Sequence, residues 1–151
     1  MRGNHDLNDK ARFFEAATDL TEGAIRSLGD SLFIAGIGWS GNRYFELPEE
    51  SNLQYLCNIV ENMWSLQTGR FMLMTHYAPR DPAAPPDKLF PDGFYFNCIG
   101  KLIQKLRPLI VIAGHCHDQF GKTISFHDTP ILFPGPMGKL LTIDTKNVRI
   151  D

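Results

Sequence analysis

The sequence lacks any long apolar run and any excess of positive charge. Its longest apolar runs, such as Leu109 to Ala113, fall far short of the roughly 20 residues that a helix needs to cross a bilayer. The amino terminus has no signal-peptide pattern. Fifteen Lys and Arg stand against 17 Asp and Glu, giving a net charge of −2, so we expect no basic patch that attracts nucleic acid or anionic membranes. These absences favour a cytoplasmic protein without either partner.

Cysteine is also scarce. Cys57, Cys98 and Cys116 are odd in number and widely spaced, which is more typical of reduced thiols than of a disulfide framework. The remaining composition is ordinary for a globular chain, with 43% apolar and 21% charged residues. A chain of this length favours one domain and buries roughly 70% of its unfolded surface. We therefore expect a single domain over residues 1–151.

The apolar pattern predicts alternating strands and helices. Continuous apolar runs at 32–37, 70–75 and 109–113 indicate buried strands. Helical spacing extends from Ser51, a candidate N-cap, to Trp64, and helices are also expected at 9–17 and 98–106. Shorter strands are expected at 122–127, 129–133 and 139–144, and loops at 39–48 and in the proline-rich segment 78–92. This alternation predicts an α/β layered domain.

Three short segments place nitrogen and oxygen donors after apolar strands or beside glycines. They are Gly3-Asn4-His5-Asp6, Thr75-His76 and Gly114-His115-Cys116-His117, and they contain four of the five histidines. Imidazole suits Zn, Fe and Mn, and an Asn side-chain oxygen can coordinate without adding charge. If residues 115–117 are extended, His115 and His117 project to opposite sides and can contact different ions. The pattern predicts a site for two metal ions.

These motifs, in this order, resemble the last three motifs of the calcineurin-like metallophosphoesterase family: Gly-Asn-His-(Asp or Glu), a single His, and Gly-His-x-His. The resemblance spans residues 3 to 117. It implies a two-sheet sandwich with helices outside and hydrolysis of a phosphoester by two divalent ions, which could be Mn, Fe, Zn or Ni. It implies that Asn4, His76 and His115 bind one ion and His117 the other, while His5 protonates the leaving oxygen. Asp6 is expected to support a neighbouring imidazole or turn.

The sequence also departs from the family pattern. The family's Asp-x-His and Gly-Asp-x-x-(x)-Asp motifs, which supply the bridging Asp and further ligands, should precede Gly3, where the chain has only two residues. We therefore expect the carboxy-terminal part of a phosphoesterase domain, with its amino-terminal strands missing. Such a part should hold at most one ion, weakly, because its remaining donors are neutral. It should also expose a sheet edge through which it could form oligomers.

Other interpretations remain at this point. The chain could be a non-catalytic remnant that acts as a metal-binding or interaction module. A histidine-rich structural zinc domain fits less well, because Asn is a rare ligand of structural zinc. After His76, the residues Tyr77, Pro79 and Arg80 are expected to line the substrate site, with Arg80 contacting a phosphate. Cys116 is expected in the core and His127 at the surface.

Overall fold

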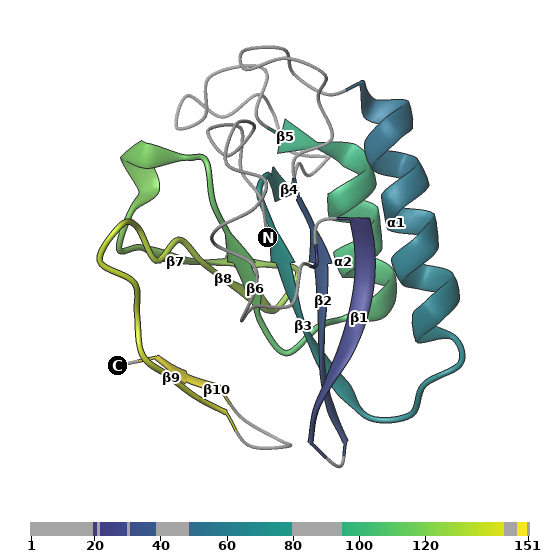
Figure 1. The fold of residues 1–151 in the computed structure, drawn as a ribbon. Coiled ribbons are helices and arrows are strands. Elements are labelled where there is room, and N and C mark those ends of the chain that lie inside the picture. Colours follow the sequence, from purple (N-terminus) through teal and green to yellow (C-terminus); the bar gives the residue numbers. More distant parts are fainter. Residues whose placement is uncertain are drawn as a thin grey trace, which may run out of the picture.

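The structure is a computed structural model that describes residues 20, 22–29, 31–38, 49–79, 95–143 and 148–150. A six-stranded sheet forms its centre, with strand order β1-β2-β3-β6-β8-β7 (Figure 1). Strands β2, β3, β6 and β8 are parallel, and the edge strands β1 and β7 are antiparallel to their neighbours. The bounds are β1 (Glu22–Gly29), β2 (Leu32–Ile37), β3 (Arg70–Thr75), β6 (Val111–Ala113), β7 (Thr123–Phe126) and β8 (Thr129–Leu132).

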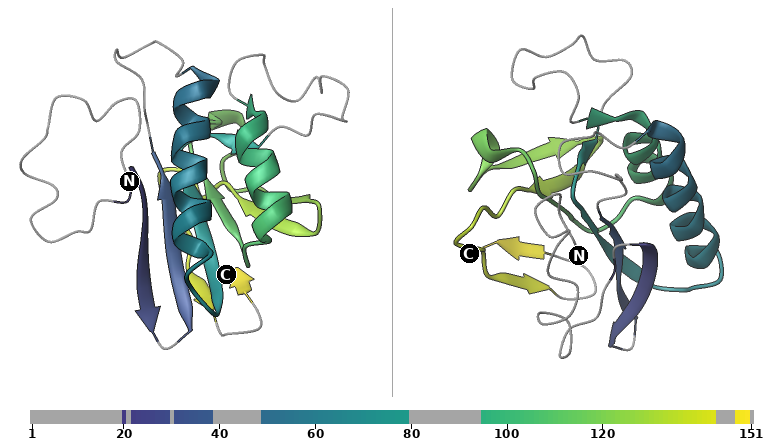
Figure 2. Two further views of the ribbon diagram at one scale, coloured as in Figure 1. Left: turned by 90° about the vertical axis from the view of Figure 1, so that its right-hand side faces the viewer. Right: turned by 45° about the horizontal axis from the view of Figure 1, so that its top comes forward.

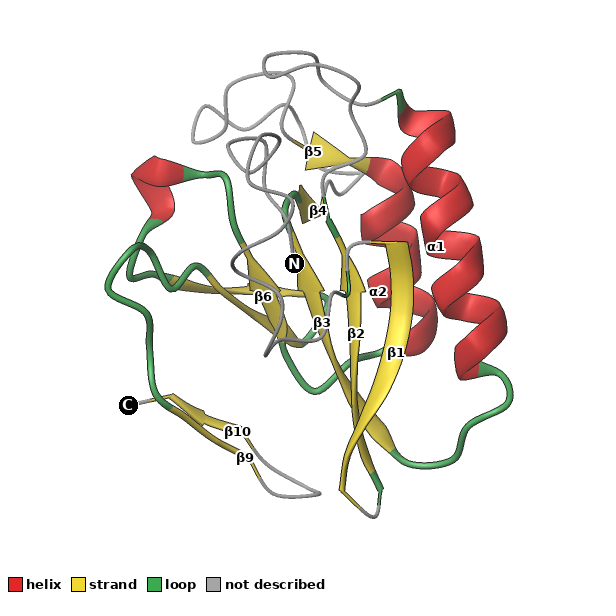
Figure 3. Cartoon of the chain, in the orientation of Figure 1, coloured by secondary structure: helices red, strands yellow, loops and turns green. Residues whose placement is uncertain are grey.

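Two helices cover one face of this sheet. Helix α1 (Glu50–Trp64) connects β2 to β3, and helix α2 (Asn97–Leu106) lies between β3 and β6. Crossovers between parallel strands are nearly always right-handed, so two crossovers that step in the same direction place their helices on the same face. Figure 3 shows them side by side. No helix in the described ranges has the length and apolar character needed to cross a membrane. Beneath them, the core includes Ala35, Leu53, Val60, Leu73, Ile99, Ile103 and Val111.

The opposite face of the sheet carries a short antiparallel pair of strands, β9 (Leu141–Ile143) and β10 (Val148–Ile150) (Figure 2). A second apolar cluster of Met72, Ile110 and Leu132 lies between the sheet and this pair. Successive side chains of a strand point to opposite faces, so Phe71 and Leu73 pack toward the helices while Met72 packs toward β9 and β10. This layered arrangement confirms the predicted α/β class.

Some element boundaries differ from the prediction. The N-cap of α1 is Glu49 and not Ser51, because the carbonyl of extended Glu49 already accepts hydrogen bonds from the N–H groups of Asn52 and Leu53, at 3.0 and 3.3 Å. The first two residues of the loop predicted at 78–92 form a strand instead, β4 (Ala78–Pro79), which pairs in parallel with β5 (Tyr95–Phe96), and residues 80–92 lie outside the described residues. The predicted helix at 9–17 and loop at 39–48 lie outside the described residues.

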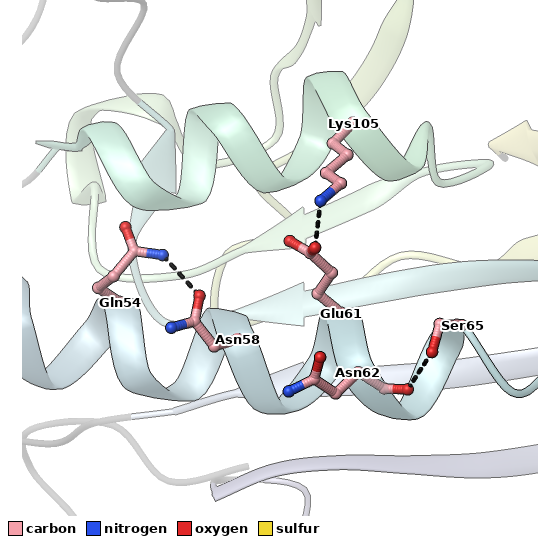
Figure 4. A network of polar contacts seen from close by, with 6 residues as sticks. All are labelled: Gln54, Asn58, Glu61, Asn62, Ser65 and Lys105. Carbon is pink, nitrogen blue, oxygen red and sulfur yellow. Dashed lines mark hydrogen bonds and ion pairs between the residues drawn. The ribbon is translucent and has the colours of Figure 1, made fainter.

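Polar contacts fix α2 against α1. The Glu50 carboxylate, on the first residue of α1, accepts a hydrogen bond of 3.0 Å from the Cys98 backbone N–H at the start of α2. Near the other end, Lys105 of α2 forms an ion pair with Glu61 of α1 (Figure 4). The helices are therefore tied at both ends, which also fixes β5, the strand that leads directly into α2.

The three cysteines are buried, and no disulfide joins them, as predicted from their number and spacing. Two of them face each other between the helices. A hydrogen bond between the Cys57 and Cys98 thiols raises the pKa of Cys57 and lowers that of Cys98. Cys116 is a core residue with 7% of its surface exposed, as expected.

Candidate metal centre

His76 lies directly after β3, where backbone contacts hold the chain on both sides of it. Its N–H donates to the Ile37 carbonyl at the end of β2, with an N···O distance of 3.0 Å. The next N–H, that of Tyr77, donates to the Thr75 hydroxyl at 3.2 Å, and Thr75 is fully buried. His76 itself is 9% exposed. The sheet thus delivers this imidazole to its carboxyl-end edge in a fixed backbone position.

His115 follows the neighbouring strand β6 in a tight turn. The preceding Gly114 N–H donates to the Thr75 carbonyl at 3.0 Å, which continues the β3–β6 ladder. The Cys116 N–H donates to the Gly114 carbonyl at 2.7 Å across His115, whose φ is +61°. An i to i+2 hydrogen bond around a residue with positive φ marks the rarer, strained form of the γ-turn. The expectation of an extended 115–117 segment is therefore wrong, because this turn and a following 3₁₀ helix replace it.

The turn brings the two imidazoles together. His115 Nδ1 lies 2.9 Å from His76 Nε2, and the rings meet edge to face with centroids 4.8 Å apart. In this hydrogen bond one nitrogen carries the proton and the other offers its lone pair. The two histidines come from the carboxyl ends of adjacent parallel strands, which is where open α/β sheets usually bind ligands.

Tyr77 packs against this pair from the protein interior. It is fully buried, and burial raises the pKa of its phenol, so the side chain stays neutral. Its ring centroid lies 5.0 Å from that of His76 and 6.0 Å from that of His115. The expectation that Tyr77 and Pro79 line a substrate cleft is wrong for both, because the β4–β5 pairing directs the chain after His76 into the core.

Of the other predicted site residues, the structure describes only His117. His117 is exposed, begins the 3₁₀ helix His117–Gln119, and packs its ring on Phe120 with centroids 4.9 Å apart. Across the described ranges, no group of three or more His, Cys, Asp or Glu side chains is placed to hold a metal ion. Asn4, His5, Asp6 and Arg80 lie outside those ranges.

His127 has the surface position expected of it. It is exposed in the turn between β7 and β8, and its Nε2 lies 2.7 Å from Gln104 Nε2. It therefore serves as a reference for a histidine that belongs to no candidate site.

The His76–His115 pair fits two ligands of one ion. A histidine nitrogen lies about 2.0–2.1 Å from a bound zinc ion. Two such nitrogens are then about 2.9 Å apart at a right angle and about 3.3 Å apart at the tetrahedral angle. The observed nitrogen separation of 2.9 Å falls at the short end of this range, so the distance suits binding of one ion by His76 Nε2 and His115 Nδ1 once the nitrogen that carries the proton has lost it.

Comparison with known proteins gives a likeness in fold. No protein-family model and no curated protein matches the chain. One crystal structure matches with a TM-score of 0.56 and 15% identity, over 86% of this chain and 52% of the other. TT1561 of Thermus thermophilus matches with a TM-score of 0.51 and 14% identity, over 80% and 52%. The chain thus spans about half the length of either neighbour.

A third structure, the Thermus thermophilus sulfate thiohydrolase SoxB in complex with glycerol, has a TM-score of 0.46 and 16% identity, over 84% of this chain and 23% of SoxB. That likeness is too distant to support an inference. The two neighbours with TM-scores above 0.5 show that the chain shares part of their fold.

Proposed function

We propose that this chain is part of a metal-dependent phosphoester hydrolase in which His76 Nε2 and His115 Nδ1 bind one divalent ion. The observation that carries the proposal is the 2.9 Å separation of these nitrogens at the carboxyl ends of adjacent parallel strands. Two imidazoles at this largely buried position carry a desolvation cost that apolar side chains there would not, which favours a role in binding. The ordered sequence motifs support the phosphoester class, and a sheet with helices outside it agrees with the fold that the family resemblance implies.

Further roles follow from the family resemblance. Asn4 would complete the first ligand set with a neutral oxygen, and His117 would bind a second ion. When bound, the divalent ions, which could be Mn, Fe, Zn or Ni, polarise a phosphoryl oxygen and lower the pKa of bound water. His5 would give a proton to the leaving oxygen, Asp6 would orient its neighbours, and Arg80 would contact the phosphate. The first ligand set contains only neutral donors, so the chain should hold at most one ion, weakly.

Metal binding tests the first part of the proposal. Calorimetric titration of Zn²⁺ or Mn²⁺ into the chain should show at most one site, and elemental analysis should give the same stoichiometry. His76→Ala and His115→Ala should each weaken binding by more than about tenfold, the smallest loss typical of changes around a metal site. His127→Ala is the matched control, because it removes an exposed histidine outside the pair. Unchanged binding in both pair variants would exclude this site.

Hydrolysis tests the second part. The chain alone should show almost no turnover of a generic aryl phosphodiester, because no carboxylate bridges two ions in the proposed ligand set. A version extended at the amino terminus by the Asp-x-His and Gly-Asp-x-x-(x)-Asp motifs should hydrolyse it in a metal-dependent way. His5→Ala should then lower kcat by about 10²–10⁴, more on an alkyl than on an aryl diester. Metal binding without hydrolysis by either version would instead favour a non-catalytic metal-binding module.

A further inference from the structure

The ring of Tyr77 packs against both candidate ligands, His76 and His115. It meets His76 edge to face, with centroids 5.0 Å apart and planes at 75°, and it meets His115 at 6.0 Å and 45°. It also meets Phe96 edge to face, with centroids 4.9 Å apart. Tyr77 has no exposed surface, so it cannot touch a substrate directly. Its contacts run instead from the protein core to the two imidazoles.

The elements that pack behind Tyr77 are tied together by hydrogen bonds. Phe96 belongs to β5 and immediately precedes α2, whose first turn is held to α1 by the Glu50–Cys98 hydrogen bond. On the other flank, the Tyr77 backbone N–H is held by the Thr75 hydroxyl. The position of the aromatic ring is therefore set by both helices and by the end of β3.

We propose that Tyr77 is a positioning residue that holds the His76 and His115 rings in the orientation that binds a metal ion. This inference rests on the proposed function. The backbone hydrogen bonds fix the main chain of each histidine, but they do not set the rotation of its ring about the side-chain bonds. A flat ring packed against both imidazoles excludes the turned orientations, and groups that orient ligands typically change metal affinity by about 10–100-fold.

The test compares ring loss beside the site with ring loss elsewhere in the core. Tyr77→Leu removes the aromatic ring that packs against both imidazoles, and Tyr77→Phe keeps it. Phe71→Leu is the control. Phe71 is also a buried aromatic residue of the same core, 2% exposed, but it lies at the opposite end of β3 and packs on Trp64. The three variants and the original 151-residue chain are titrated with Co²⁺ while the visible absorption spectrum and the thermal midpoint are recorded.

Tyr77→Leu should weaken Co²⁺ binding by about tenfold or more and change the Co²⁺ spectrum. Tyr77→Phe should bind within about twofold of the original chain, and Phe71→Leu should lower the thermal midpoint while keeping the Co²⁺ affinity and spectrum. Unchanged binding by folded Tyr77→Leu, or an equal loss in Phe71→Leu, would overturn the assignment.

A metal-free measurement separates this inference from the proposed function. If the original chain binds no Co²⁺, the proposed function fails. Nitrogen–proton correlation spectra of the imidazoles, recorded with chelator present, still test the positioning. Tyr77→Leu should merge the distinct ring-nitrogen signals of His76 and His115 toward averaged values, and Phe71→Leu should not. Ring signals that are identical in Tyr77→Leu and the original chain would refute the positioning role.

Discussion

His76 and His115 should stabilise the metal-free chain jointly, and a double-mutant cycle can measure this. His76 is 9% exposed, and its Nε2 lies 2.9 Å from His115 Nδ1. A buried polar group that loses its partner costs about 1–3 kcal/mol, whereas the net gain of one hydrogen bond is about 0.5–1.5 kcal/mol. His115→Ala retains a Cβ in the γ-turn, so it leaves the backbone strain in place. Each single variant should therefore lose about 1–3 kcal/mol, and the double variant should lose less than the sum by about 0.5–1.5 kcal/mol.

Urea unfolding of the original chain, both single variants and the double variant, with chelator present, measures this coupling. The same four proteins with a divalent ion at about 100 times its Kd then test the metal site, since the original chain alone should gain about 2.7 kcal/mol. Losses that add to within about 0.3–0.5 kcal/mol would show that the two rings do not interact in solution. If the metal ion raises the free energy of unfolding of the double variant as well, the ion binds elsewhere.

Three further predictions concern stability. Gly36→Ala should cost about 1–3 kcal/mol in urea unfolding, because its Cβ would lie 2.4 Å from Leu20 Cβ and 2.5 Å from the Leu20 carbonyl oxygen; a loss below about 0.5 kcal/mol would contradict this packing. Arg107→Gly should raise Tm by roughly 2–4 °C, because Arg107 ends α2 with a φ of +48° that costs a non-glycine residue about 1 kcal/mol or more; a fall in Tm would contradict it. Burial raises the pKa of Tyr77, so the native state keeps a proton that the unfolded chain loses above about pH 10. This contribution is complete below that pH and declines above it by up to about 1.4 kcal/mol per pH unit. Tyr77→Phe should flatten the alkaline loss of stability, and equal slopes for the two proteins would refute the argument.

The central strands β2 and β3 could be predicted from sequence because each contains a continuous run of apolar residues. β2 and β3 match the predicted bounds 32–37 and 70–75, since parallel strands covered on both faces need apolar side chains on both. The edge strand β1 was not predicted. Only Ile25 among its eight residues is β-branched, five of the eight are exposed, and Gly23 and Gly29 have positive φ values of 77° and 158°. Pairing with β2, not local pattern, makes this segment a strand.

At the candidate site, the sequence identified His76 and His115 but not how they meet. The two rings lie close together because His115 has a positive φ. No local sequence pattern around a histidine predicts this uncommon conformation. The position of Tyr77 depends on the pairing of Ala78 with Tyr95, two residues far apart in the sequence. Whether a residue after a strand faces solvent or core is thus decided by tertiary contacts, which explains why Tyr77 was expected at the surface of a cleft.

Anomalous X-ray diffraction from crystals of the chain soaked in Zn²⁺ or Mn²⁺ tests the central claim most directly. Data collected at the absorption edge of the metal locate the ion independently of any assumed ligands. We predict a single strong peak about 2.0–2.2 Å from both His76 Nε2 and His115 Nδ1. An ordered structure in which the ion lies only at an exposed histidine such as His127, with His76 and His115 still bonded to each other, would contradict the proposed metal centre.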